Sequence, residues 1–213
     1  FYGEWPRYIV SEQDGMVMAY VPTQTIVMGG GLDADEVPAR PVEVSHFYMD
    51  IHEVTNAQFS QCVGSGEYRK YYVPGYNDAH PVRSVTWYEA AGYAQWAGKE
   101  LPTEAQWEAA ARSDDQRLYP WGNDAESEVT RYLCNHRTDR MDFDGYEFVA
   151  PAMNFAPGVS PFGIFNMAGN VWEWCADNYD PGRYGYPSPL DPATGLDRGA
   201  KPFGDRGYPN VHK

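Results

Sequence analysis

The pattern of apolar and polar positions in the first fifty residues predicts short β-strands. Residues 16–20 and 25–28 are apolar runs separated by Pro22, which favours either a hairpin or one bent strand that ends at three glycines. Residues 33–40 are acidic and contain proline, as is typical of a loop. Residues 41–50 then alternate apolar and polar positions, and this period of two indicates a strand with one face on a core.

Helix signals follow these strands. A helix is expected to open within residues 53–59, with Thr55 as its N-cap. Thr86 and Glu89 are three residues apart and form the capping box that begins a second helix. Several alanines give this helix a face small enough for close packing, and Gly98 is a good C-terminal stop.

A further capping box, Thr103 with Gln106, predicts another helix directly afterwards. Trp107 is expected on its buried face as a core residue. Beyond this helix the chain is aromatic, glycine-rich and irregular, so we expect no further long helix. Residues 146–149 and 171–174 are candidates for short strands.

Composition favours one folded, loop-rich domain over residues 1–213. The 21 glycines and 17 prolines are spread along the chain, 15% of the residues are aromatic, and no repeat or low-complexity linker divides the sequence. The net charge of −14 disfavours nucleic acid and anionic membrane surfaces as partners. No apolar run reaches the length of about 18 residues that a transmembrane helix needs.

The chain has three cysteines, Cys62, Cys134 and Cys175, which are far apart and lack the spacing of a zinc site. At most one disulfide can form among them. The five histidines show no pairing at helical spacing. No nucleophile elbow, phosphate-binding loop or dinucleotide-binding fingerprint is present.

Six segments, in order and with sensible spacing, resemble motifs of the formylglycine-generating-enzyme (sulfatase-modifying factor) family. They read VPTQTIVMGG at 21–30, FYMDIHEVTN at 47–56, HPVRSVTWYEA at 80–90, KELPTEAQWE at 99–108, PWGN at 120–123 and NMAGNVWEW at 166–174. The matches cover about residues 16–177. The resemblance implies an α+β, C-type-lectin-like fold, with a twisted antiparallel sheet, two main helices and long irregular loops held by calcium ions.

The resemblance also implies a calcium site in the last motif. Asn166 and Glu173 would supply side-chain oxygens, and Gly169 and Val171 would supply backbone carbonyls. Such an oxygen set suits a hard cation, with water filling the remaining positions. The alternative is that the two polar side chains only cap turns. In either case Trp172 is expected to pack in the core.

A second calcium site is implied by four residues: Asn135, His136, Asp144 and Tyr146. Asp142 is a substitute ligand if the register differs. The alternative interpretation is an ordinary Asp-Gly turn with a solvated carboxylate.

Oxidase chemistry is less well supported. Active family members hold copper(I) between two cysteines that follow a strand of the type RxxRGGSW near the end of the domain, and thiolates suit this metal. Residues 197–200 resemble that strand only weakly, and no cysteine follows Cys175. Cys134 and Cys175 are a conceivable copper pair, although a structural disulfide or two buried thiols are more ordinary. Copper is therefore not expected, and no catalytic residue is assigned.

These observations favour a non-catalytic, calcium-stabilised scaffold or accessory subunit of an extracytoplasmic protein assembly. The absent closing segment is expected to leave an open sheet edge that a partner chain covers. One alternative is a formylglycine-generating oxidase, using copper and O₂, whose C-terminal catalytic segment is missing from this chain. Another is a lectin-like ligand-binding protein with aromatic loops at 179–186 as its surface. The extracytoplasmic placement rests on calcium dependence and on Phe1 standing in place of an initiator Met.

Overall fold

The structure is a computed structural model that describes residues 3–30, 37–68, 77–124, 132–136 and 144–178, with only the backbone of 64–68. Several sequence-based expectations lie outside these residues: the first half of the loop at 33–40, Asp142, the aromatic loops at 179–186 and the segment at 197–200. In the described part, no helix is long and apolar enough to cross a membrane.

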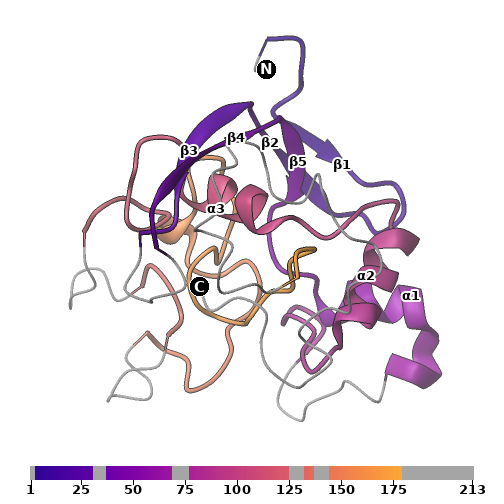
Figure 1. Cartoon of the computed structure of the whole chain (residues 1–213). Coiled ribbons are helices and arrows are strands. Elements are labelled where there is room, and N and C mark those ends of the chain that lie inside the picture. The colour runs from indigo at the N-terminus through magenta and orange to yellow at the C-terminus, as the bar shows by residue number, and fades with distance from the viewer. Residues whose placement is uncertain (1–2, 31–36, 69–76, 125–131, 137–143, 179–213) are drawn as a thin grey trace.

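The described strands form two small antiparallel sheets (Figure 1). The first has the order β1-β2-β5 and consists of β1 (Tyr8–Val10), β2 (Val17–Val21) and β5 (Phe47–Asp50). The second pairs β3 (Gln24–Met28) with β4 (Arg40–Val44). Together with three helices, these sheets make the α+β class that was expected.

The chain passes from one sheet to the other at two adjacent crossings. Strand β2 continues into β3 through Pro22 and Thr23, so the bent strand is the correct interpretation and the hairpin is wrong. The strand expected at 41–50 is interrupted at Ser45 and His46, and its two halves join different sheets as β4 and β5. The His46 amide donates to Thr23 Oγ1 at 3.0 Å, which holds the two crossings together.

Each of the three α-helices in the described residues begins at a threonine N-cap. They are α1 (Asn56–Tyr68), α2 (Trp87–Trp96) and α3 (Glu104–Arg112). Both predicted capping boxes, at Thr86 and Thr103, are present. Thr55 and Gln58 make the same reciprocal pair of bonds at the start of α1. Gly98 follows the C-cap of α2 with a φ of 71°, as expected of a helix stop.

Helix α3 connects the two sheets into one core. Ala105 and Ala109 pack with buried side chains of β3 and β4, and the next two alanines pack with β2. Trp107 is partly buried at the border of this core, so its expected core position holds only in part. Helices α1 and α2 lie against each other (Figure 1). They share a separate apolar cluster around Phe59.

The described residues after α3 form no strand, so the strands expected at 146–149 and 171–174 are wrong. Backbone groups there bond to side chains in place of a neighbouring strand. For example, Asn135 Nδ2 donates to the Phe148 carbonyl at 3.0 Å. A short 3₁₀ helix, η2 (Ala156–Gly158), is the regular element of this part of the described chain.

Trp172 was expected in the core, and this expectation is wrong because its side chain is 59% exposed. Two residues on, Trp174 is partly buried and its Nε1 donates to the Val85 carbonyl at 3.0 Å. The segment therefore anchors itself to the fold through Trp174 and presents Trp172 at the surface.

Candidate functional site

A buried carboxylate joins the turn between β5 and α1 to the last motif of the chain. Glu53 Oε2 accepts a hydrogen bond from Asn166 Nδ2 at 2.9 Å, and Oε1 accepts one from Asn170 Nδ2 at 2.7 Å. Both asparagines have left-handed φ angles, 53° and 64°, a region that Asn adopts more readily than most residues. These turns aim both amides at Glu53, although 113 and 117 residues separate the partners in sequence.

Glu173 lies near Glu53, and protein atoms enclose its carboxylate although the residue as a whole is partly exposed. Burial, together with the charge of Glu173, raises the pKa of Glu53 to about 8 against the opposing amide hydrogen bonds. Burial also raises the pKa of Glu173 to about 7, opposed by the 2.8 Å hydrogen bond from Trp107 Nε1. Two buried carboxyl groups that lie close together are costly to ionise at the same time. A cation bound between them would favour their ionised forms, so the site is favourable for a cation.

A small cavity of about 20 Å³ is lined by the first predicted calcium set: Asn166, Gly169, Val171 and Glu173. The Asn166 amide is oriented by its Nδ2, which donates to Glu53 and to the Ala152 carbonyl. Its Oδ1 is buried and has no hydrogen-bond partner among the described residues. Buried polar atoms are rarely left in this state, and the cavity is large enough for one ion or water molecule. The residues present therefore fit a hard cation.

The structure also brings together the second predicted set: Asn135, His136, Asp144 and Tyr146. Asp144 is buried, and its two oxygens accept hydrogen bonds from the His136 and Tyr146 amides, each at 3.0 Å. The Asp-Gly turn of the alternative interpretation is present, but its carboxylate is buried rather than solvated. Among the described residues of this set, no buried side-chain oxygen lacks a hydrogen-bond partner. The two sets abut, because a side chain at Gly169 would collide with the Asn135 carbonyl.

Within the described ranges, no group of three or more His, Cys, Asp or Glu side chains is placed to hold a metal ion. A cation site in this part of the chain would consequently depend on amide and carbonyl oxygens as well as carboxylates. The first set offers such a mixture, whereas the carboxylate of the second set is already engaged by backbone amides.

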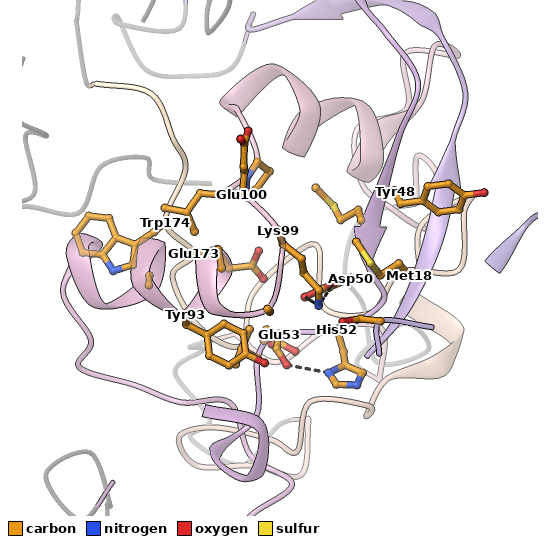
Figure 2. A pocket seen from close by; sticks show the side chains of 18 of the residues that line it. Met18, Tyr48, Asp50, His52, Glu53, Tyr93, Lys99, Glu100, Glu173 and Trp174 are labelled. Atoms are coloured by element: carbon orange, nitrogen blue, oxygen red, sulfur yellow. Dashed lines mark hydrogen bonds and ion pairs between the residues drawn. The ribbon is translucent and has the colours of Figure 1, made fainter. Parts of the chain in front are cut away.

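A larger cavity of about 610 Å³ adjoins the same carboxylates (Figure 2). Its walls come from β5, from one face of α2, and from the segments 98–102 and 171–174. Figure 2 shows the carboxylates of Asp50, Glu53 and Glu173 pointing toward its centre.

Lys99 enters this cavity because α2 ends in a Schellman turn, in which the Lys99 amide donates to the Ala94 carbonyl at 2.7 Å. Its Nζ lies 2.8 Å from both Asp14 Oδ2 and Asp50 Oδ1. The Tyr93 hydroxyl also donates to Asp14, at 2.7 Å. The ammonium group is thus shared between two carboxylates.

Sequence reasoning missed Glu53, Lys99 and Asn170 as members of the site. Glu53 and Lys99 lie within the quoted segments FYMDIHEVTN and KELPTEAQWE, where they were treated as framework. One feature of the sequence could have identified Glu53 and Lys99: each is an ionisable residue inside a segment that otherwise contributes to the core. Its partners lie far away in the sequence, so the pattern alone did not identify them.

All three cysteines are free thiols: Cys62 on α1, and Cys134 and Cys175, both buried. For Cys134 and Cys175 the sequence left a structural disulfide and two buried thiols as alternatives. The buried thiols are correct and the disulfide is wrong. The Sγ of Cys134 lies 3.5 Å from His136 Nδ1, and Cys175 lines the small cavity.

Comparison with solved structures relates the fold to known proteins. PvdO from Pseudomonas aeruginosa superimposes with a TM-score of 0.64 at 24% identity, covering 87% of this chain and 80% of that one. Treponema denticola variable protein 1 gives a TM-score of 0.58 at 18% identity, covering 81% and 77%. These likenesses show the fold.

Sequence comparison gives the family. The formylglycine-generating enzyme of Thermomonospora curvata is 36% identical, covering 75% of this chain and 71% of that protein. The serine/threonine-protein kinase pkn1 of Chlamydia pneumoniae is 34% identical over 90% of this chain, and the chain spans 34% of its length. The mouse inactive C-alpha-formylglycine-generating enzyme 2 is 28% identical, covering 83% and 73%. Residues 10–204 match the family described as the sulfatase-modifying factor enzyme 1-like domain, to which this chain belongs.

Proposed function

We propose that this chain is a non-catalytic, calcium-stabilised scaffold or accessory subunit of an extracytoplasmic protein assembly. The observation that carries the calcium part is the small cavity, which is lined by both Asn166 and Glu173, together with the buried Asn166 Oδ1, which has no hydrogen-bond partner among the described residues. Gly169 and Val171 would add backbone carbonyls, and water would complete the roughly six to eight oxygens that calcium takes. The bound ion would stiffen the loop and offset the cost of ionising Glu53 and Glu173.

The scaffold part is supported by the first sheet. Strand β5 ends that sheet and pairs with β2 on one side, with no second partner strand among the described residues. An uncovered strand edge attracts further chains, and a partner protein would cover it. The extracytoplasmic placement is supported by the proposed ligand set, in which one carboxylate is joined by neutral amide and carbonyl oxygens. A site with few charged ligands binds calcium weakly, so it fills where calcium is abundant.

The second candidate function is a formylglycine-generating oxidase, favoured by the identity with the Thermomonospora curvata enzyme. A family oxidase needs two thiolates that hold one copper ion. Here Cys62 lies on α1, and Cys134 and Cys175 lie beside the two predicted calcium sets. We expect no formylglycine when a cysteine-containing sulfatase peptide is incubated with the chain, copper and oxygen. Catalytic conversion, seen by mass spectrometry, would make the chain an enzyme.

Calcium addition tests the first proposal. In metal-stripped buffer, calcium at about 100 times its Kd should stabilise the chain by about 2.7 kcal/mol and raise Tm accordingly. Glu173→Gln should remove most of this gain. Glu43→Gln, the same chemical change at an exposed position of β4, should leave the gain unchanged. An identical Tm with and without calcium would refute the calcium site.

A further inference from the structure

Cys175 is a buried thiol in the wall of the small cavity. The residue is 3% exposed, and it lines this cavity together with Asn166 and Glu173. The buried Asn166 Oδ1, which has no hydrogen-bond partner among the described residues, independently marks the same cavity as a place for a ligand. A cation bound to this oxygen would therefore occupy a cavity whose wall contains a thiol.

A thiol reagent cannot reach Cys175 through this cavity. The cavity has a volume of about 20 Å³, which is room for one ion or water molecule but not for a larger reagent. A reaction of Cys175 therefore requires local opening of the segment that carries it. An ion that binds only the closed form would oppose this opening by mass action.

The segment 173–177, which carries this thiol, is anchored beside the starts of α2 and α3. Trp87 Nε1 donates to the Cys175 carbonyl at 2.8 Å. The Ala176 amide donates to the Pro102 carbonyl, also at 2.8 Å. The first residue of the same segment supplies the carboxylate of the small cavity. Opening that exposes the thiol would consequently displace this carboxylate, so an open segment could not hold the ion.

We propose that Cys175 is a calcium-gated thiol: the bound ion keeps it buried and reduced, and loss of the ion lets a low-molecular-weight disulfide modify it. The thiol gives its proton to solvent, and its thiolate attacks one sulfur of the reagent. A mixed disulfide forms at Cys175, the S–S bond of the reagent breaks, and the other half leaves as a thiolate.

The modified chain should be unable to bind calcium again. The group added to Cys175 is larger than the small cavity, so the segment 173–177 cannot close around the ion. Removal of the mixed disulfide by a thiol reductant should restore binding. The inference rests on the proposed calcium site and adds a redox regulation to it.

The test incubates the full chain with glutathione disulfide, with and without calcium, and follows each cysteine by peptide mass spectrometry. At a calcium concentration of about 100 times its Kd, modification of Cys175 should slow about 100-fold. Cys62 is the internal control, because it lies on α1 in a separate apolar cluster, and its rate should not change.

Variants separate the ion from the thiol. Glu173→Gln should remove most of the calcium dependence of the Cys175 rate, and Glu43→Gln, at an exposed position of β4, should leave it unchanged. After treatment with glutathione disulfide in chelator, the unchanged chain should have lost its calcium-dependent rise in Tm. Cys175→Ser should retain that rise after the same treatment.

Calcium that raises Tm but leaves the Cys175 rate unchanged overturns the inference, while the calcium-stabilised scaffold stands. Equal slowing of Cys62 and Cys175 overturns it as well, because the ion would then protect the whole fold rather than gate one segment. If calcium changes neither Tm nor the Cys175 rate, the calcium site and the gated thiol are both refuted.

Discussion

The region from β1 to α3 and the region at 144–178 are held together by different kinds of contact. In the first, strand pairing and helix caps satisfy the backbone, and apolar clusters fill the interior. In the second, asparagines replace strands: Asn170 bonds through Oδ1 to the Ala150 amide and through Nδ2 to the Ala150 carbonyl. The second region adds Phe162, Ile164 and Met167 to the same apolar cluster as the first, but its backbone is paired by a few buried polar side chains. The comparison teaches that this region depends on whatever satisfies the remaining atoms of those side chains.

The largest effect should come from the apolar core of the first region. Phe59→Ala removes a fully buried ring between α1 and α2 and should cost about 3–5 kcal/mol of unfolding free energy. Urea denaturation measures the loss. Calcium should add the same increment to the variant as to the unchanged chain, because the damage lies in the first region. A calcium increment that disappears in the variant would show that the two regions are not separable in this way.

Asn170→Ala probes the second region. It removes bonds to Glu53, Ala150 and Asn135, and unsatisfied buried groups of this kind cost about 1–3 kcal/mol. Because the φ of Asn170 is 64°, part of the loss is backbone strain. Asn170→Gly relieves that strain, so the loss that remains reports the hydrogen bonds. A fully stable glycine variant would mean that the side-chain network contributes little.

Acid should weaken the first region through Asp14. Burial raises the pKa of this carboxyl, but hydrogen bonds from Lys99, Ser11, Tyr93 and the Met16 amide outweigh it and lower the pKa to about 2, from an ordinary 3.8. The folded pKa is the lower one, so the stabilisation is complete above pH 3.8 and is lost as the pH falls toward 2. The loss should be about 2 kcal/mol.

Denaturation curves between pH 5 and pH 2 measure this loss for the unchanged chain and for Asp14→Asn, which should lack it. Asp114→Asn, at an exposed position, is the matched control. The same acid loss in the Asp14→Asn variant would assign the effect to other carboxyl groups.

The smallest effect should be that of Trp172→Ala. The side chain is largely exposed, and surface substitutions usually change stability by less than about 0.5 kcal/mol. Trp174→Ala, which removes the hydrogen bond to Val85, should cost more. Thermal melts of both variants compare the two tryptophans, and a larger loss at Trp172 would contradict the exposed position.

Sequence reasoning succeeded where the decisive contacts are local. The boxes at Thr86 and Thr103 need partners only three residues away, and the strand periods reflect one buried face. It failed for 171–174, because a short stretch that is rich in apolar residues does not by itself have a partner strand. The members of the small cavity came from the family resemblance, whereas the contact of Glu53 with Asn166 spans 113 residues and leaves no periodic signal.

The two crossings at Thr23 and His46 are hydrogen-bonded to each other, so the number of residues in one crossing is tied to the number in the other. In β3 and β4, buried residues alternate with exposed ones, as Ile26 does with Thr25 and Val42 does with Glu43. Inserting one residue at a crossing would exchange these faces and place polar side chains in the interior. Because the crossings are hydrogen-bonded to each other, the displacement would reach the second sheet as well. A surface turn can absorb an inserted residue without moving its neighbours. At these crossings the same insertion would shift the strands of both sheets.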